Sequence, residues 1–156
     1  MGDRCTCYIT VKRVDKDKAI EILQGIGWSP YIIEDKGSPT TDLELSEVNY
    51  ADLEDETKAL LAAGIEHTIY NCAGGNYSEG YKHYRFLDNG ELYAADYSEM
   101  EKFVDPEIVR RWLTECETKE EIRNQLDAYV KSTSEPEWDM ECKNFKRYLL
   151  TQVVKP

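Results

Sequence analysis

Hydrophobic and polar residues alternate along two stretches of the N-terminal half, and this period of two predicts half-buried strands. In segment 5–13 the apolar positions are Cys5, Cys7, Ile9 and Val11. Segment 41–48 directs Leu43 and Leu45 inward, with Asp42, Glu44 and Ser46 outward. Short apolar runs at 28–35, around Tyr31, Ile32 and Ile33, and at 65–72 predict two further strands.

Apolar residues recur every three to four positions between these strands, which predicts two helices. The helix over 15–25 carries Ala19, Ile22, Leu23 and Ile26, and Gly25 and Gly27 are expected to end it. Asp52 is expected to cap the second helix, Leu53, Leu60, Leu61 and Ala63 to face the core, and Gly64 to end it. The order β-α-β-β-α-β predicts a ferredoxin-like split βαβ sandwich over residues 1–72.

The C-terminal half, residues 73–156, shows a different pattern. Two alternating segments, 81–87 and 91–95, flank Asp88-Asn89-Gly90 and predict a β-hairpin. Helix starts are predicted at Ser98 with Glu101, at Asp105-Pro106 and at Thr118 with Glu121. Trp138, Phe145 and Leu149 predict a last helix, or a helix running into a strand at Val153-Val154.

The expected fold is therefore α+β, a ferredoxin-like N-terminal half extended by a hairpin and C-terminal helices. Because Gly74-Gly75 is too short for a linker, we expect residues 1–156 to form a single domain.

The net charge of the chain narrows the classes of partner that the protein can bind. Acidic residues outnumber basic ones 31 to 19, which gives a formal net charge of −12. Such a surface repels nucleic acid and anionic membranes and attracts basic protein surfaces, including those that bind nucleic acid. No apolar run approaches the roughly 20 residues that span a bilayer. We therefore expect a cytoplasmic protein that binds neither membrane nor nucleic acid directly.

The acids concentrate between residues 34 and 58, and this cluster is the predicted partner-binding site. Its candidate residues lie on the third strand and at the start of the second helix: Asp42, Glu44, Glu47, Asp52, Glu54, Asp55 and Glu56. In one interpretation these carboxylates mimic a row of phosphates and occupy a nucleic-acid groove in a partner. In the alternative they form a solvated face that favours the helix dipole.

The sequence gives weaker signals for metal binding and for catalysis, and neither a cofactor nor a metal is expected. Cys5 and Cys7 share a strand face, but a zinc site needs four ligands and buried apolar thiols explain the pair better. A Cys72–His67 or Cys72–His83 dyad is the enzymatic alternative. The hairpin tyrosines, Tyr77, Tyr81, Tyr84, Tyr93 and Tyr97, predict either a protein interface or an ordinary strand face.

Three short segments carry a resemblance: 47–51 (EVNYA), 62–65 (AAGI) and 73–77 (AGGNY). They resemble uncharacterised small acidic proteins of bacteriophages and mobile elements, which are similar to anti-CRISPR proteins. The resemblance implies a non-enzymatic inhibitor of a basic, nucleic-acid-binding host defence complex, of anti-CRISPR or antirestriction type. The alternatives are a small accessory enzyme with an unrecognised site and a phage structural or housekeeping interaction protein.

Overall fold

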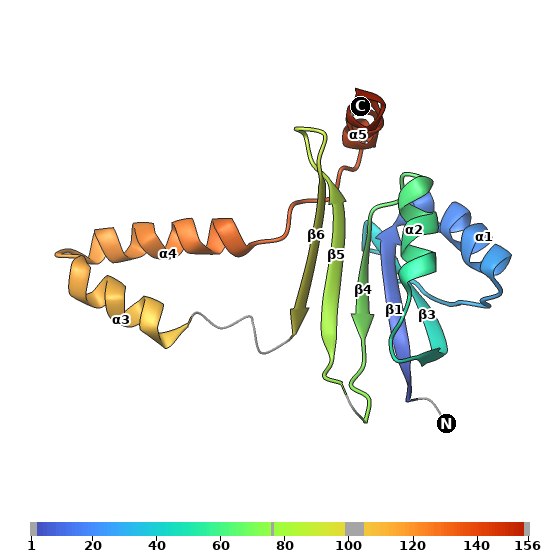
Figure 1. The fold of residues 1–156 in the computed structure, drawn as a ribbon, viewed down its shortest axis with the longest axis horizontal. Coiled ribbons are helices and arrows are strands. Elements are labelled where there is room, and N and C mark those ends of the chain that lie inside the picture. Colours follow the sequence, from blue (N-terminus) through green and yellow to red (C-terminus); the bar gives the residue numbers. More distant parts are fainter. Residues whose placement is uncertain (1–2, 76, 99–104, 155–156) are drawn as a thin grey trace.

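A computed structural model describes residues 3–75, 77–98 and 105–154 (Figure 1). These residues form an α+β fold with one six-stranded antiparallel sheet and five α-helices. The strands are β1 (Arg4–Lys12), β2 (Tyr31–Ile33), β3 (Thr40–Asn49), β4 (His67–Asn71), β5 (Gly80–Phe86) and β6 (Leu92–Ser98). The helices are α1 (Lys16–Ile26), α2 (Glu54–Ala62), α3 (Pro106–Glu115), α4 (Lys119–Thr133) and α5 (Lys143–Val154).

The sheet has the order β2-β3-β1-β4-β5-β6, and every neighbouring pair is antiparallel. The register between β1 and β3 shifts between Cys5 and Cys7, which marks a bulge. The hairpin β5–β6 adds directly to β4, so both halves of the chain contribute to one continuous sheet.

The core lies on one face of this sheet. The odd-numbered residues of β1 are buried there, as alternation predicts, and they pack with Leu43 and Leu45 of β3. Ala19 and Leu23 of α1 and Leu60 of α2 cover them. We call the opposite face of the sheet the open face, because α1 and α2 leave it uncovered.

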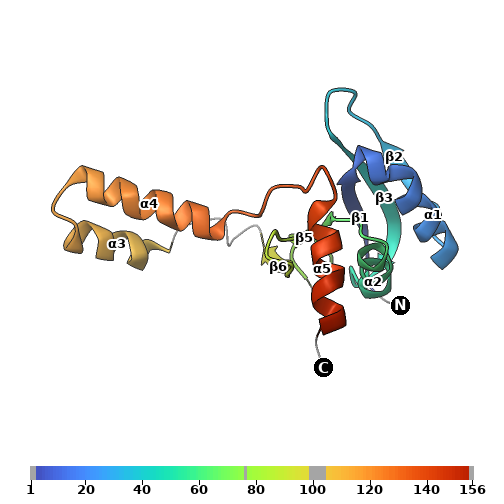
Figure 2. The same ribbon diagram turned by 90° about the horizontal axis from the view of Figure 1, so that it is seen from above.

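An extended segment of residues 134–142, here called the strap, joins α4 to α5. It crosses the upper end of the open face, whereas α5 lies against the other face, where Phe145 and Tyr148 contact Phe86 of β5 (Figure 2). The ring centroids of Phe86 and Phe145 are 4.9 Å apart. The C-terminal segment therefore holds β5 from both sides.

Helices α3 and α4 form an antiparallel pair, here called the arm, which projects away from the sheet beyond β6 (Figures 1 and 2). The Asp105 side chain caps α3 by accepting from the amide of Glu107. Thr118 and Glu121 form the predicted capping box of α4. Both predicted starts are confirmed. None of the helices in the described ranges is long and apolar enough to cross a membrane.

Several predicted boundaries were wrong. Helix α1 ends as predicted at Gly27, which adopts a left-handed conformation with φ of 115°, but it continues through Gly25, the other glycine expected to end it. Strand β2 has three residues instead of eight, and all three are exposed. Leu53 occupies the N-cap position of α2 without a side-chain hydrogen bond, and Asp52, one residue earlier, accepts from the amide of Glu54 through Oδ1.

In the C-terminal half, the alternative of a strand at 153–154 was wrong, because α5 runs to Val154. Trp138 lies in the strap instead of a helix. The capping box predicted for Ser98 and Glu101 depends on Glu101, which lies outside the described residues.

Candidate functional site

A row of tyrosines crosses the open face at one level of the sheet. The strand registers place six side chains opposite one another: Tyr31, Glu44, Tyr8, Tyr70, Tyr81 and Tyr97, one from each strand. We call this set the tyrosine row. It arises because directly paired residues in antiparallel strands point to the same face.

The rings within this row contact one another. The centroids of Tyr8 and Tyr70 are 6.0 Å apart and those of Tyr70 and Tyr81 are 4.7 Å apart. Tyr81 also stacks on His83, which lies 5.6 Å from Tyr97. The side chains of Tyr8, Tyr70, Tyr81 and Tyr97 are half-buried, and Tyr31 at the edge is 70% exposed. The rings of Tyr8, Tyr70 and Tyr81 thus form an aromatic surface that is partly open to solvent.

Carboxylates accompany these rings. Glu44 lies between Tyr31 and Tyr8, and the Tyr70 hydroxyl donates to Glu79 Oε2 at 2.9 Å. This hydrogen bond is the main cause that raises the pKa of Tyr70 to about 12, with burial and the charge of Glu79 adding to it. Burial, followed by the charge of Glu44, raises the pKa of Tyr8. The phenols therefore stay neutral at physiological pH while the neighbouring carboxylates supply negative charge.

The next level of the sheet continues this chemistry. It consists of Ile33, Asp42, Thr10, Thr68, His83 and Ala95. Thr10 Oγ1 donates to Asp42 Oδ1 at 2.6 Å, which fixes that carboxylate on the open face. Neither level contains a lysine or an arginine, so the exposed charge of these two levels is negative.

The strap lies at the upper limit of this surface, where the basic side chains are paired with acidic groups and with the strap. Arg85 of β5 donates to Glu135 Oε1 at 2.9 Å, and its guanidinium lies 3.6 Å from the ring centroid of Trp138. The same glutamate pairs with His83. Lys12 of β1 is buried beneath the strap, where it approaches Glu66 at 3.6 Å. The basic groups at this end of the sheet are therefore already paired.

The structure divides the acids that the sequence grouped together. Asp42 and Glu44 lie on the open face, whereas α2 with Glu54 and Asp55 covers the opposite face. Because the helix and the outward strand positions are on different sides of the sheet, the two sets do not form the single patch at the strand-to-helix junction that we expected.

Within the second set, Glu56 differs most from expectation. It is 7% exposed and accepts a hydrogen bond from Trp28 Nε1 at 2.6 Å. Glu54 pairs with Lys58 at 2.6 Å, and Asp52 accepts from the amide of Glu54. The expectation that Glu56 is exposed at a partner-binding surface was therefore wrong, because its carboxylate is buried and bonds Trp28 within the protein.

Glu47 lies within β3 at the register shift against β1, with φ of 63°, and pairs with Arg4 at 3.2 Å. Both side chains are exposed. Of the predicted acids, Asp42 and Glu44 alone belong to the two levels of the open face described above.

Sequence reasoning missed half of the tyrosine row. It grouped the tyrosines of the hairpin, of which Tyr81 and Tyr97 do lie in the row. Tyr84 and Tyr77 pack instead against the core on the other face. Tyr8 and Tyr70 were not assigned to the site. Their even position in alternating strands was the available signal, but their alignment depends on strand order, which the alternation does not encode.

The thiol and imidazole groups do not assemble a catalytic pair. His67 is buried on the core face, with Nδ1 3.0 Å from the carbonyl oxygen of Ile65. His83 contacts Thr68 and Glu135 on the open face. Cys72 is half-buried, and its pKa is raised by burial, then by the charges of Cys5, Glu79 and Glu44. It therefore lies among the carboxylates of the open face, away from His67.

Cys5 and Cys7 are buried with their sulfur atoms 3.6 Å apart, as expected for neighbouring core thiols. Among the residues with described positions, no group of three or more histidine, cysteine or carboxylate side chains is arranged to hold a metal ion.

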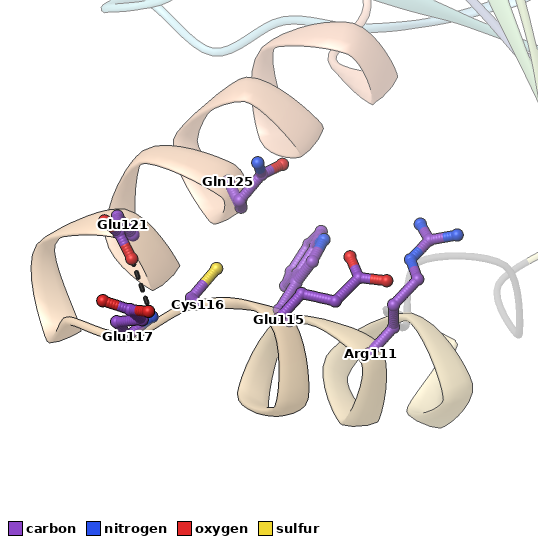
Figure 3. Close-up of a pocket in the computed structure, with 7 residues that line it drawn as sticks. Arg111, Glu115, Cys116, Glu117, Glu121 and Gln125 are labelled. Atoms are coloured by element: carbon purple, nitrogen blue, oxygen red, sulfur yellow. Dashed lines mark hydrogen bonds between the residues drawn. The ribbon is translucent and has the colours of Figure 1, made fainter.

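A cavity of about 530 Å³ lies between the two helices of the arm (Figure 3). Its lining comprises Arg111, Trp112, Glu115, Cys116, Glu117, Glu121 and Gln125. Glu121 accepts from the amide of Glu117 at 2.7 Å and thereby serves the helix start. The described lining includes no histidine to activate the Cys116 thiol. We therefore interpret this cavity as space left at the turn between two helices and not as a reaction site.

Comparisons with protein-family models, with curated proteins and with solved structures find no significant match for this chain.

Proposed function

We propose that this protein is a non-enzymatic binding protein whose tyrosine row, with Asp42 and Glu44, receives a basic surface of a partner protein. The observation that carries the proposal is the row itself, which combines phenol rings in contact with one another with a carboxylate and contains no lysine or arginine. Aromatic faces attract cations through their quadrupole, and adjacent carboxylates add charge-assisted hydrogen bonds.

Arginine suits this surface better than lysine. The planar guanidinium stacks on an aromatic ring while it donates a fork of hydrogen bonds to a carboxylate. The protein already holds one guanidinium in this way, since Arg85 lies over Trp138 and bonds Glu135. A partner arginine over Tyr8, paired with Glu44, would repeat that arrangement on the exposed part of the face.

The wider setting is part of the same proposal. A net charge of −12 opposes direct contact with nucleic acid, and basic surfaces of this kind are common in proteins that grip nucleic acid. We therefore propose a cytoplasmic inhibitor, of phage or mobile-element origin, that competes with nucleic acid for a host defence complex. The order β2-β3-β1-β4, all antiparallel, supports a ferredoxin-like split βαβ unit in the N-terminal half.

The test uses an arginine-rich peptide as a defined probe, titrated by nuclear magnetic resonance. We expect shifts confined to the open face. The double variant Asp42→Asn with Glu44→Gln should weaken binding by at least about tenfold, since each close charge pair contributes roughly 1 kcal/mol or more. The matched control is Glu54→Gln with Asp55→Asn, which removes the same charge from α2 on the opposite face.

Equal losses from both double variants would show that only net charge matters and would refute a specific site. A competition assay then tests whether the protein and nucleic acid share a binding site on the partner. The partner is first purified from a bacterial lysate at low salt by its binding to this protein. Added nucleic acid should then displace this protein from the partner. Simultaneous binding of both would refute competition but leave the peptide site intact.

A further inference from the structure

The arm presents partly exposed apolar side chains on both of its helices. Val109 and Leu113 of α3 are 37% and 64% exposed, and Leu126 and Val130 of α4 are 41% and 51% exposed. Inside the pair, Trp112 is buried and packs edge-on against Tyr129, with ring centroids 5.7 Å apart. Each helix therefore uses one part of its apolar surface within the pair and leaves another part in solvent.

Two helices projecting alone gain little stability from each other. Isolated helices of this length are marginal in water, and helical folds become stable when apolar faces are buried against further helices. The projection of α3 and α4 away from the sheet, seen in both views, leaves the body of the protein unable to supply that cover (Figures 1 and 2).

The charge of the arm favours a second copy of this chain as the occupant. Helices α3 and α4 together contain five acidic residues, Glu107, Glu115, Glu120, Glu121 and Asp127, and five basic residues, Arg110, Arg111, Lys119, Arg123 and Lys131. Their net charge is therefore zero, whereas the remaining residues carry the whole net charge of −12. The arm is thus a neutral surface, on which a second copy of this acidic chain meets no net repulsion and finds both signs of charge to pair with.

We propose that the arm is a self-association surface, on which two copies pair their α3–α4 hairpins as an antiparallel four-helix bundle. The antiparallel arrangement keeps the two acidic bodies at opposite ends of the bundle. Because α4 has 15 residues and is roughly 22 Å long, the bodies are separated by more than the screening length of about 8–10 Å at physiological ionic strength.

Sedimentation velocity of the full chain over a concentration series tests this proposal. We expect a concentration-dependent species of twice the 18.1 kDa chain mass. Leu113→Lys and Val130→Lys, one on each helix, should each weaken self-association by at least about tenfold, because a lysine in an apolar interface must be desolvated. Circular dichroism checks that both variants keep their helix content.

Two matched controls introduce the same lysine on other exposed apolar surfaces. Leu150→Lys on α5, 68% exposed in the parent, and Ile32→Lys on the edge strand β2, 40% exposed, should leave self-association unchanged. The proposal would be overturned if the protein were a monomer at every concentration. It would also be overturned if Ile32→Lys or Leu150→Lys disrupted the dimer while both arm variants kept it. Asp42→Asn with Glu44→Gln should leave the dimer intact, which separates this result from failure of the peptide site.

Discussion

The ammonium group of Lys12 donates a hydrogen bond to the carbonyl oxygen of Asp139 at 2.7 Å, across 127 residues of sequence. Lys12 is 1% exposed. Burial acts to lower its pKa, but a hydrogen bond to Cys142 and the charges of Asp15 and Glu66 outweigh burial and raise the pKa. Lys12 therefore remains charged inside the protein and holds the strap to the first strand.

Replacing Lys12 by methionine should destabilise the fold by about 3–5 kcal/mol, because the buried carboxylate of Glu66 then loses its counter-ion. The measurement is urea unfolding at neutral pH. Lys58→Met is the control, since Lys58 and Glu54 form an exposed pair whose loss costs about 1 kcal/mol or less. Adding Glu66→Leu to the Lys12 variant should recover part of the loss, and an additive loss would contradict the paired burial.

Stability should fall as the pH falls from about 6.5 to about 4 because of His67. Burial, aided by the charge of Arg85, lowers its pKa from 6.5 to about 4. Between these values the unfolded chain binds a proton that the folded chain does not, so acid favours unfolding. The expected contribution is roughly 2–3 kcal/mol between pH 7 and pH 4.5.

Urea unfolding at both pH values checks this expectation. His67→Leu removes the titrating group and should flatten the difference between the two pH values, whatever its effect on stability at pH 7. An unchanged pH dependence in that variant would assign the acid sensitivity to other groups.

Two glycine-to-alanine changes should act in opposite directions. Gly64 has φ of 79°, and a Cβ there would lie 2.4 Å from the Phe145 ring of α5. Gly64→Ala should therefore lose roughly 2–4 kcal/mol through backbone strain and overpacking. Gly25 lies within α1 with open space around its Cα, so Gly25→Ala should gain up to about 1 kcal/mol. Thermal unfolding distinguishes them, and a stabilised Gly64 variant would contradict the close approach of Gly64 to Phe145 of α5.

The five thiols should divide into two reactivity classes. Cys5 and Cys7 are buried, and burial together with the hydrogen bond between the two thiols raises the pKa of Cys7, so both should react only after unfolding. Cys72, Cys116 and Cys142 are half-buried and should react in the folded protein. Timed alkylation with mass spectrometry measures the rates.

Cys72 also provides a reporter for the proposed site, because it lies among Glu44 and Glu79. An arginine-rich peptide should slow its alkylation and leave that of Cys116 unchanged. Equal protection of both thiols would indicate non-specific coating of the acidic protein.

The two proposed interfaces should differ in how their affinities depend on salt concentration. Binding of the arginine-rich peptide to the carboxylates of the tyrosine row should weaken steeply with ionic strength, since exposed charge pairs are screened. Self-association through Leu113 and Val130 should change little, because apolar burial is largely insensitive to moderate salt. Affinities over a salt series measure both effects, and a flat response of the peptide would refute an electrostatic site.

Local patterns predicted most of the elements because their causes are local. Alternation in β1 and β3, the Asp88-Asn89-Gly90 turn and the Thr118–Glu121 capping box each depend on neighbouring residues. The predicted boundaries around Gly25 and β2 were wrong because glycine is tolerated within a helix and because the exposed apolar residues of β2 mimic a buried strand.

The candidate site was only partly predictable because it forms between distant segments. Asp42 and Glu44 were identified from outward positions in one strand, yet the alignment of Tyr8, Tyr70 and Tyr81 requires the register of three strands. The burial of Glu56 depends on Trp28, 28 residues earlier, which no periodicity reveals. Strand pairing and helix placement therefore decide which acids share a surface.

The strap also determines when the protein can finish folding. Its contacts with Lys12, Glu66 and Arg85 join the first strand and the middle of the sheet to a segment that is synthesised after all six strands. Until residues 134–142 emerge from the ribosome, the cations and the carboxylate at the top of the open face lack these partners. Contacts of such long sequence separation slow folding, because a large loop must close before they form. We therefore expect a nascent chain that ends before the strap to remain susceptible to proteolysis at this end of the sheet, and to become resistant when α5 is complete.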